Sequence, residues 1–427
     1  MKKTLVAAVV AVTAVALAGC SSGPAESAVS TAAPTGTIQF QSWTPTQETF
    51  DQISAGFTKE NPKAKVTGTL SPFEDYQTAL QTQLRSGGGP DVFVVQPGAM
   101  LNQYRQYIEP VDAYEAAFDG KEWESAYNAG PLKRSQVGGK TYGLPVGYGV
   151  AGFLWVNKTI LKEQGIAVPK TYAELKAAAA KLHDAGIAPI AFGGKDTWQD
   201  VDYFLATAAA IDAKATYAAL DGSGKWTDPS IVSAFEKWKA LFADGLTQEG
   251  AAGAATYTDT YDLFTKGKAA FFANGSWNLD MYKNSLPLVS GYDIDAIPLP
   301  VDGVAGGAPV IGDVTGIVVV NKNSKNKSAA FQLARYMSRG AGAQTLTDAA
   351  LDFPVTKNGP TPQGLPEQAS TARASIESLI ADHLAGYRQV PSASVNTALG
   401  DALVGVISSG LSPADAAKRV QEAADNS

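Results

Sequence analysis

One stretch of the chain reads Tyr76-Gln-Thr-Ala-Leu-Gln-Thr-Gln-Leu-Arg-Ser-Gly-Gly-Gly-Pro-Asp-Val92 and changes character midway. Its first part, Tyr76 to Arg85, predicts a helix that the run Gly87-Gly88-Gly89-Pro90 ends. The residues from Asp91 to Val95 are apolar after the aspartate, which is typical of a strand buried in a parallel sheet. The stretch therefore predicts strands that alternate with helices, the pattern of an α/β protein.

The same alternation extends outward along the chain. In the segment Gln47–Glu60, the side chains of Phe50, Ile53 and Phe57 recur at spacings of three and four, so they share one face of a helix. Further helices are predicted at Tyr172–Asp184, Ile231–Asp244, Ser328–Ser338 and Ser412–Ala424. Strands are predicted at Thr37–Trp43, Lys65–Leu70, Gly149–Asn157, Pro189–Phe192, Lys268–Ala273, Tyr292–Pro298 and Gly316–Asn321.

The N-terminus has the pattern of an export signal. Lys2 and Lys3 precede an apolar run from Leu5 to Ala18, and small residues lead to Cys20. We expect residues 1–19 to be a signal peptide; the alternative is a retained membrane helix, for which the run is short. Residues 20–36 are rich in Ser, Ala, Pro, Thr and Gly and predict a flexible tether.

Composition limits the classes of function. The chain has 427 residues and a formal net charge of −7, and loss of Lys2 and Lys3 would bring it to −9. An acidic protein is poorly suited to bind nucleic acid, so no nucleic-acid partner is expected. Cys20 is the only cysteine, which excludes an internal disulfide. The length suits two domains rather than one.

Five blocks of sequence, in this order, resemble a known family. They are Phe57-Thr-Lys-Glu-Asn-Pro-Lys-Ala-Lys-Val66, the opening stretch Tyr76 to Val92, Gly139-Lys-Thr-Tyr-Gly-Leu-Pro145 followed by Leu154-Trp-Val-Asn-Lys158, Phe264-Thr-Lys-Gly-Lys-Ala-Ala-Phe-Phe-Ala-Asn-Gly-Ser-Trp277, and Val318-Val-Val-Asn-Lys-Asn-Ser-Lys-Asn326. Together they resemble the ABC-transporter extracellular solute-binding proteins of the maltose-binding type. Leu17-Ala-Gly-Cys20 separately resembles the lipobox of bacterial lipoproteins, in which the cysteine is acylated.

The resemblance implies a two-lobed, periplasmic-binding-protein-like α/β fold of type II with a hinge that the chain crosses several times. Lobe 1 would hold residues 37–147 and 301–338, and lobe 2 residues 148–300 and 339–427. Crossings are expected near 147–152, 297–301 and 337–342. The implied function is capture of a sugar by cleft closure and delivery to ABC permease subunits. The protein would be a monomer, anchored through Cys20 to the outer face of the cell membrane.

Sugar binding needs aromatic rings that stack on the sugar and polar side chains that bind its hydroxyl groups. The resemblance points to Trp277, which follows Asn274 at a strand-to-helix turn, and to Trp198 with Asp196 in a loop after a strand. Core packing is the alternative role for each tryptophan. Trp155 and Trp238 have apolar flanks that indicate the core, while Trp123 and Trp226 fit either the surface or the rim.

Six further residues are expected to line the cleft. Trp43 ends the first strand, Gln96 follows the strand after Asp91, and Tyr148 lies at the first crossing. The complete set of additional candidates is Trp43, Gln47, Gln96, Tyr148, Asp313 and Asn396. For Gln47, helix capping or a solvated face is the alternative.

Signatures of catalysis fail in this sequence. Gly138-Gly-Lys-Thr141 resembles part of a phosphate loop, but Arg134 stands where the required first glycine would be. No Gly-x-Ser-x-Gly motif is present, and the two histidines, His183 and His383, are far apart. We therefore expect no enzyme activity, cofactor or metal. A binder of a non-sugar solute and a secreted glycosidase stay open as alternatives.

Overall fold

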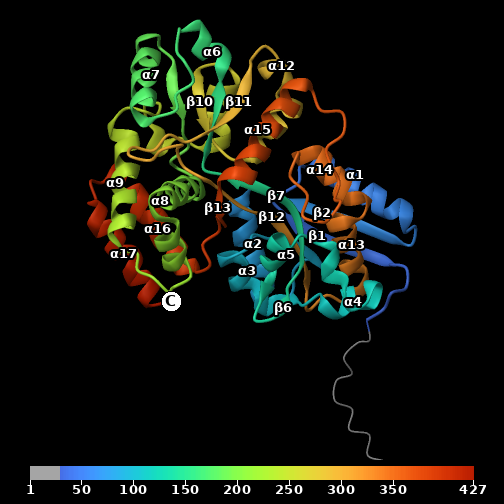
Figure 1. Ribbon diagram of the computed structural model, residues 1–427. Helices are drawn as coiled ribbons and strands as arrows, with labels where there is room; N and C mark the ends of the chain where they lie inside the picture. Colours follow the sequence, from blue (N-terminus) through green and yellow to red (C-terminus); the bar gives the residue numbers. More distant parts are fainter. Residues whose placement is uncertain (1–28) are drawn as a thin grey trace, which may run out of the picture.

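The computed structural model describes residues 29–427. The chain forms two lobes, each built on its own sheet (Figure 1). The predicted signal peptide, Cys20 and the tether up to residue 28 lie outside the described residues. Among the residues that are described, none of the helices is both long and apolar enough to cross a membrane.

The first lobe contains a seven-stranded sheet with the strand order β13-β12-β3-β1-β2, in which β4 and β7 also pair with β12. β1 runs parallel to β2 and β3, whereas β12 is antiparallel to β3, β4 and β7. The strands are β1 (Gly36–Ser42), β2 (Ala64–Leu70), β3 (Val92–Val95), β4 (Ile108–Glu109), β7 (Leu144–Ala151), β12 (Val310–Asn321) and β13 (Leu384–Gly386). A separate hairpin pairs β5 (Gln136–Val137) with β6 (Lys140–Thr141).

Both faces of the first sheet are covered by helices. Val92 and Val94 pack into one hydrophobic cluster with residues of α1 and α13, while Phe93 and Val95 pack into another with residues of α2 and α3. Burial on both faces explains why β3 is continuously apolar. The helices of this lobe are α1 (Gln47–Glu60), α2 (Phe73–Arg85), α3 (Ala99–Tyr104), α4 (Asp112–Asp119), α5 (Ala129–Lys133), α13 (Lys327–Arg339) and α14 (Ala341–Ala350), with the short turns η1 (Arg105–Tyr107) and η2 (Trp123–Ala126).

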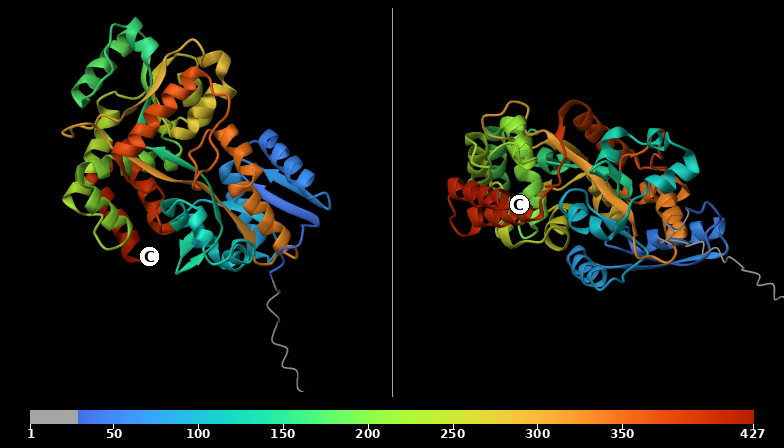
Figure 2. Two further views of the ribbon diagram at one scale, coloured as in Figure 1. Left: turned by 45° about the vertical axis from the view of Figure 1, so that its right-hand side comes forward. Right: turned by 90° about the horizontal axis from the view of Figure 1, so that it is seen from below.

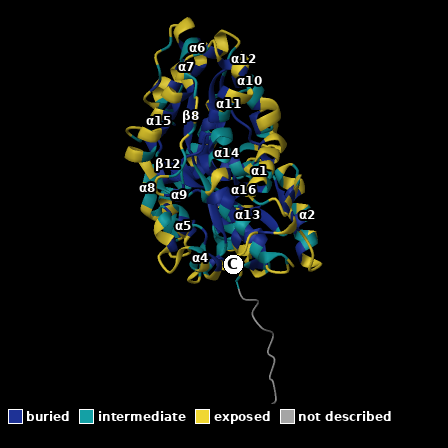
Figure 3. Cartoon of the chain, turned by 90° about the vertical axis from the view of Figure 1, so that its right-hand side faces the viewer, coloured by how far each residue is buried: buried dark blue, intermediate teal, exposed yellow. Residues whose placement is uncertain are grey.

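The second lobe contains a four-stranded sheet with the order β11-β8-β10-β9. Its strands are β8 (Phe153–Asn157), β9 (Ala188–Ala191), β10 (Ala269–Ala273) and β11 (Ile294–Pro298). Its helices are α6 (Lys158–Glu163), α7 (Tyr172–Asp184), α8 (Thr197–Leu220), α9 (Pro229–Ala243), α10 (Tyr261–Thr265), α11 (Met281–Asn284), α12 (Leu286–Val289), α15 (Glu367–His383), α16 (Ala393–Ser408) and α17 (Pro413–Asp425), with η3 (Ala251–Gly253), the π-helix η4 (Thr256–Thr260) and η5 (Ser276–Asp280). Buried residues follow the sheets through both lobes and exposed ones lie on the outer helices (Figure 3).

Local signals in the sequence placed several elements accurately. α1 begins after Thr46, whose side chain accepts a hydrogen bond from the backbone of Thr49, and α7 begins with a capping box of Thr171 and Glu174. Both helices have the predicted bounds. Trp155 and Trp238 are buried as expected, and Trp123 and Trp226 are buried as well.

The strand that the sequence predicts over 149–157 is two strands in the structure. The sequence indicated one strand over 149–157, but β7 ends at Ala151 and β8 begins at Phe153 in the other sheet. Gly152 between them has φ +88°, and a Cβ atom there would overlap Ala206. The chain therefore crosses between lobes at Gly152, inside the range expected for the first crossing.

The second crossing begins inside the expected range, whereas the third falls later than expected. The chain leaves the second sheet at Pro298, within 297–301, and enters the first at Val310. The third lies in residues 351–366, because α14 packs against α1 and α13 of lobe 1 (Figure 2). At Gly342 a Cβ atom would lie 2.6 Å from the Tyr336 ring, so this glycine permits close packing and not hinge rotation. The expected lobe 1 boundary at 338 thus leaves out one helix that packs with that lobe.

Part of the expected tether is held on the surface of lobe 1. The backbone oxygen of Ala32 accepts a hydrogen bond from Gln332 at 2.9 Å, and that of Thr35 accepts one from Asn326 at 2.8 Å. Pro34 is buried, and Val29 packs against the core of this lobe. The prediction of a flexible tether over 20–36 is therefore wrong for residues 29–36, because Gln332 on α13 and Asn326, the residue before it, donate hydrogen bonds to their backbone.

Candidate ligand-binding site

Three aromatic rings gather where the strands of the second sheet end. β9 and β10 are parallel neighbours, so the loops that follow them leave the sheet at the same edge. The loop after β10 carries Trp277 in η5, and the loop after β9 leads to Trp198 in the first turn of α8. The ring centroids of the two tryptophans are 6.0 Å apart, and that of Tyr257 lies 6.1 Å from that of Trp198.

The backbone around Trp277 is shaped by glycines. A Cβ atom at Gly275 would overlap the indole ring, so the turn requires glycine. A Cβ atom at Gly149 in β7 would lie 3.4 Å from the same ring. Trp277 therefore stands against the crossing strand, where its ring is half-buried.

A buried ion pair supports the Trp277 ring. The Arg388 guanidinium lies 4.7 Å from the ring centroid and is joined to the Asp202 carboxylate by bonds of 2.7 and 3.0 Å. The two charged side chains are only 8% and 3% exposed. A cation over an indole face is favourable, and the ion pair fixes where that cation stands. No local pattern indicates this pair, because Asp202 lies on α8 and Arg388 follows β13.

Asp196 joins two loops of this region. Its Oδ2 accepts a hydrogen bond from the backbone N–H of Thr256 at 2.7 Å. The Thr256 hydroxyl donates to the Gln199 side-chain oxygen at 2.5 Å, and Gln199 donates to the backbone oxygen of Ala273. Asp196 is half-buried and comes two residues before Trp198 in the chain. The structure thus brings Asp196, Trp198 and Trp277 together at one edge of the second sheet, and their contact with a ligand stays a prediction.

Asn274 lies beneath the turn that carries Trp277. Its Oδ1 accepts a hydrogen bond from the Gly275 N–H at 2.8 Å, and the residue is 1% exposed. The amide nitrogen is buried and has no partner among the described residues. Asn274 therefore shapes the turn. Its side chain is not exposed in this structure, whereas the sequence analysis expects it to contact the ligand.

Asp313 is also engaged within the protein. Its carboxylate forms an ion pair of 2.9 Å with Arg134, and its side chain is fully buried. It also accepts a hydrogen bond from the Val314 N–H at 3.0 Å. β12 thus places Asp313 inside the hinge, where Arg134 already pairs with its carboxylate, and a contact of Asp313 with a ligand stays a prediction.

The first lobe contributes fewer candidates. Trp43 and Gln96 follow β1 and β3, which are neighbouring parallel strands, so both stand at one edge of the sheet. Trp43 is half-buried, with its ring centroid 5.0 Å from that of Phe73, and Gln96 is half-buried too. Gln47 is exposed and donates to Asp51 one turn along α1 at 2.8 Å, so the alternative of a solvated helix face fits it better.

The two lobes touch beside this edge. The backbone N–H of Ala99 donates to the backbone oxygen of Val390 at 2.9 Å, and the Asn102 side chain donates to that of Pro391 at 2.9 Å. The segment that accepts these bonds leads into α16, in whose first turn Asn396 is exposed. This contact brings the loop of Gln96 and the start of α16 near each other from opposite lobes.

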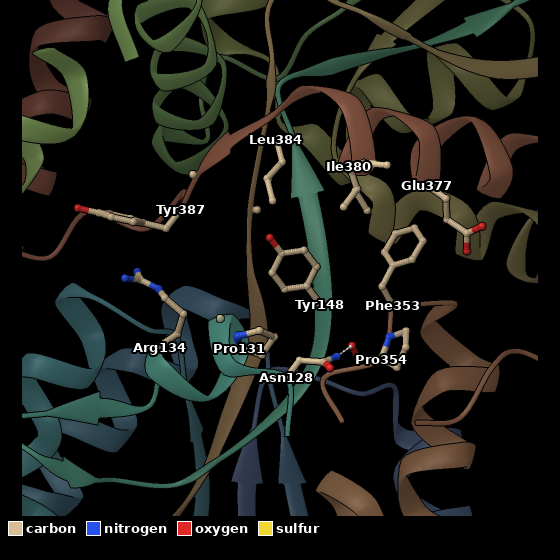
Figure 4. A pocket seen from close by; sticks show the side chains of 14 residues that line it. Asn128, Pro131, Arg134, Tyr148, Phe353, Pro354, Glu377, Ile380, Leu384 and Tyr387 are labelled. Carbon is tan, nitrogen blue, oxygen red and sulfur yellow. Dashed lines mark hydrogen bonds between the residues drawn. The ribbon is translucent and has the colours of Figure 1, made fainter. Parts of the chain in front are cut away.

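Tyr148 lines a pocket at the hinge whose lining does not include Trp277. A pocket of about 520 Å³ lies at the hinge between α5, the crossing strands and α15 (Figure 4). Tyr148, Phe353, Leu384 and Tyr387 form its apolar walls, and Arg134 lies 4.3 Å from the centroid of the Tyr387 ring. Successive side chains of a strand point to opposite faces, and Gly149 faces Trp277. The hinge pocket is therefore on the other side of β7.

Burial raises the pKa values of two acidic side chains beside the crossing strands. Burial, followed by repulsion from Asp313, raises the pKa of Tyr148 to about 12. Burial also raises the pKa of Asp352, next to Phe353 in the chain, to about 7. The Asp352 carboxylate accepts a hydrogen bond from Thr315 at 2.9 Å and would overlap any Cβ atom at Gly147. Neutral forms are thus favoured around the crossing strands.

Comparison with known proteins adds to this geometry. Residues 42–344 match the family model described as bacterial extracellular solute-binding protein. The chain is 26% identical over 307 residues to the multiple sugar-binding protein of Streptococcus mutans, covering 70% of each chain. It is 24% identical over 366 residues to the galactooligosaccharide-binding protein of Bacillus subtilis, covering 84% of this chain and 81% of that one. A solved structure of a solute-binding protein in complex with raffinose has a TM-score of 0.73 at 21% identity and covers 92% of this chain and 99% of its own.

Proposed function

Because the chain belongs to the bacterial extracellular solute-binding proteins, we propose that it captures a carbohydrate and delivers it to the permease of an ABC importer. The observation that carries the proposal is the aromatic cluster of Trp198, Tyr257 and Trp277 beside the half-buried Asp196. Flat rings stack on the apolar face of a pyranose, and a carboxylate accepts hydrogen bonds from its hydroxyl groups. The names of the sugar-binding relatives support the same class of ligand.

The proposed mechanism is closure of the lobes around the sugar. Trp43 and Gln96 stand on lobe 1, and Trp198, Trp277 and Asn396 on lobe 2, so a sugar that touches both sets favours the closed form. A ligand shifts such an equilibrium by its difference in affinity for the two states. The permease subunits would recognise the closed form, and the protein would carry out no chemical step itself.

The location follows in two steps. Membership of the family places the protein outside the cytoplasm. The finer proposal is that Cys20 carries lipid chains that anchor it to the outer face of the membrane, with the protein acting as a monomer. Replacing Cys20 by Ser should release the protein from membranes or leave its signal uncleaved. Membrane attachment that persists with normal cleavage would contradict the anchor.

The function is tested by calorimetric titration of residues 29–427 with monosaccharides, oligosaccharides, putrescine and a dipeptide. We expect heat of binding with a saccharide, and recovery of that saccharide intact by chromatography. Binding of putrescine or the dipeptide alone would overturn the sugar proposal. Release of shorter sugars would instead favour a glycosidase. Solution X-ray scattering with the bound saccharide should show a more compact particle.

A further inference from the structure

The segment between β13 and α16 joins the sheet of lobe 1 to the helices of lobe 2, and three consecutive residues in it have different partners. The Tyr387 ring lies beside Arg134 of lobe 1, whose guanidinium is 4.3 Å from the ring centroid. The next residue, Arg388, contacts Trp277 and Asp202 of lobe 2. The segment therefore links a charge of lobe 1 to the surroundings of the Trp277 ring.

Arg134 and Asp313 together hold the backbone of the third residue, Gln389. Its backbone oxygen accepts a hydrogen bond from Nη2 of Arg134, and its N–H donates to Oδ2 of Asp313, each at 3.4 Å. Nε of Arg134 also donates to the two carboxylate oxygens of Asp313 at 2.9 and 3.1 Å, which fixes the pair itself. Because Gln389 directly follows Arg388, holding its backbone limits where the Arg388 side chain can stand.

Opposite charges alternate along this path. Their order is Arg134, Asp313, Arg388 and Asp202, and the side chains of the last three are at most 8% exposed. Burial lowers the pKa of Arg388, but the charge and hydrogen bonds of Asp202 and, next, the charge of Asp313 outweigh it and raise the pKa. Asp313 thus attracts both arginines, since buried charges are weakly screened.

We propose that Arg134 is a positioning residue of the sugar site, which acts through Asp313 and the backbone of Gln389 to keep Arg388 on the Trp277 ring. The inference rests on the proposed function, and it adds a residue of lobe 1 to the support of a ring on lobe 2. Loss of Arg134 would release the segment, so that Arg388 no longer holds the ring in the orientation for stacking. Arg134 itself is engaged with Asp313 and would not contact the sugar.

The orientation of the ring can be followed without any ligand. The chain has seven tryptophans, so incorporation of 5-fluorotryptophan gives a fluorine NMR spectrum of seven signals, and Trp277→Phe identifies the signal of Trp277. Arg134→Met keeps much of the side-chain length and removes its charge and hydrogen bonds. We expect this variant to shift or broaden the Trp277 signal, because the Arg388 charge moves relative to the indole ring.

Arg335→Met is the matched control. Arg335 is 23% exposed against 22% for Arg134, lies 4.6 Å from the centroid of the Phe118 ring and pairs with Asp119, so its surroundings are of the same kind. These partners belong to α4 of lobe 1. The control should therefore leave the Trp277 signal at its position, and thermal melting shows whether each variant is folded.

Affinity tests the link to the sugar. In calorimetry with a saccharide that binds, Arg134→Met alone should weaken binding by roughly threefold or more, within the range for coupled side chains. In the Trp277→Ala protein the same change should weaken binding by less than about twofold, since the ring through which it acts is gone. Arg134→Met with Asp313→Asn leaves no carboxylate buried without its partner, so this pair replaces the single variant if that one does not fold.

Each result bears on the inference. An unmoved Trp277 signal in the folded Arg134 variant would overturn it and leave the proposed function intact. Equal losses of affinity with and without the Trp277 ring would overturn it too, because Arg134 would then act independently of the ring. If no saccharide binds the unaltered protein, the proposed function fails and the role of Arg134 in sugar binding fails with it, while the fluorine spectrum still decides whether Arg134 positions the ring.

Discussion

The two sides of strand β7 have different surroundings. On the side of Gly149, half-buried rings are accessible, and a buried ion pair of Arg388 and Asp202 stands behind them. On the side of Tyr148, a pocket of about 520 Å³ has apolar walls, and its Arg134 is already paired with Asp313.

The difference lies in which polar groups are still available. A selective site needs donors and acceptors that the ligand satisfies, because buried polar groups left unpaired are costly. At the hinge the charges satisfy each other, whereas beside Trp277 the accessible surface carries rings and the half-buried Asp196. We therefore propose that the ligand binds on the Trp277 side. The residues of the hinge pocket would instead set how the two lobes are positioned.

The largest expected effect concerns the ion pair behind the rings. Asp202→Ala leaves the Arg388 charge buried without a partner and should reduce the free energy of unfolding by about 3–5 kcal/mol. Denaturant titration measures this loss. The double variant Asp202→Leu with Arg388→Met removes both charges and should recover much of the stability. If the single variant is as stable as the unaltered protein, the pair is not buried as described.

The free energy of unfolding should depend on pH through Asp352, which lies beside the crossing strand β7. The folded-state pKa of Asp352, about 7, is above the ordinary value of 3.8, so the folded protein binds the extra proton between these values. The free energy of unfolding should therefore fall as pH rises from about 4 to 7, by at most about 4 kcal/mol from this group.

The matched variant for this pH effect is Asp352→Asn, which cannot titrate. The difference between the two proteins isolates Asp352, because other buried carboxyl groups such as Glu115 are present in both. Relative to the unaltered protein, the variant should gain stability as pH rises through this window. Parallel stability curves from pH 4 to 8 would contradict the raised pKa.

Trp277→Ala should weaken sugar binding by about 2 kcal/mol, roughly thirtyfold in the dissociation constant. The ring would no longer stack on the sugar, and Arg388 would lose the surface on which it lies. Calorimetry and thermal melting of the same variant separate binding from folding. A folded variant with unchanged affinity would remove the stacking role, and a fall in melting temperature alone would indicate a core residue.

The smallest effect is expected on the other side of β7. Tyr148→Phe keeps the wall of the hinge pocket and removes only a hydroxyl group, so sugar affinity should change by less than about 0.5 kcal/mol. This variant is the counterpart of Trp277→Ala in the same titration. A loss as large as that of Trp277→Ala would show that the ligand contacts Tyr148, and would reverse the assignment of the two sides.

Local patterns predicted much of the fold. The bounds of α1 and α7 matched because capping side chains and helical periodicity are recorded within a few residues. The single strand over 149–157 was wrong, since the apolar run continues through Gly152 while the chain changes sheets. The boundary before α14 failed because glycines at 340 and 342 were interpreted as a hinge, whereas they allow close packing on Tyr336.

The candidate site also contains some residues that local sequence patterns indicate and others that they do not. Trp277, Trp198 and Asp196 could be predicted because each belongs to a recognisable block or loop of the chain. Tyr257 lacked any local signal, since an exposed ring in a polar segment is ordinary until its neighbours are known. Sequence position does not reveal that polar atoms of Asn274 and Asp313 are engaged inside the protein, which only the structure shows.

By itself, the sequence determined the alternation of strands and helices, the family and the loops that carry the tryptophans, because these depend on neighbouring residues. Only the tertiary structure decided that Arg388 meets Asp202, 186 positions away, and that Tyr148 faces the hinge pocket while Gly149 faces the Trp277 ring. The physical reason is that contacts between distant residues depend on how the lobes pack. No local pattern of hydrophobic and polar side chains encodes that packing.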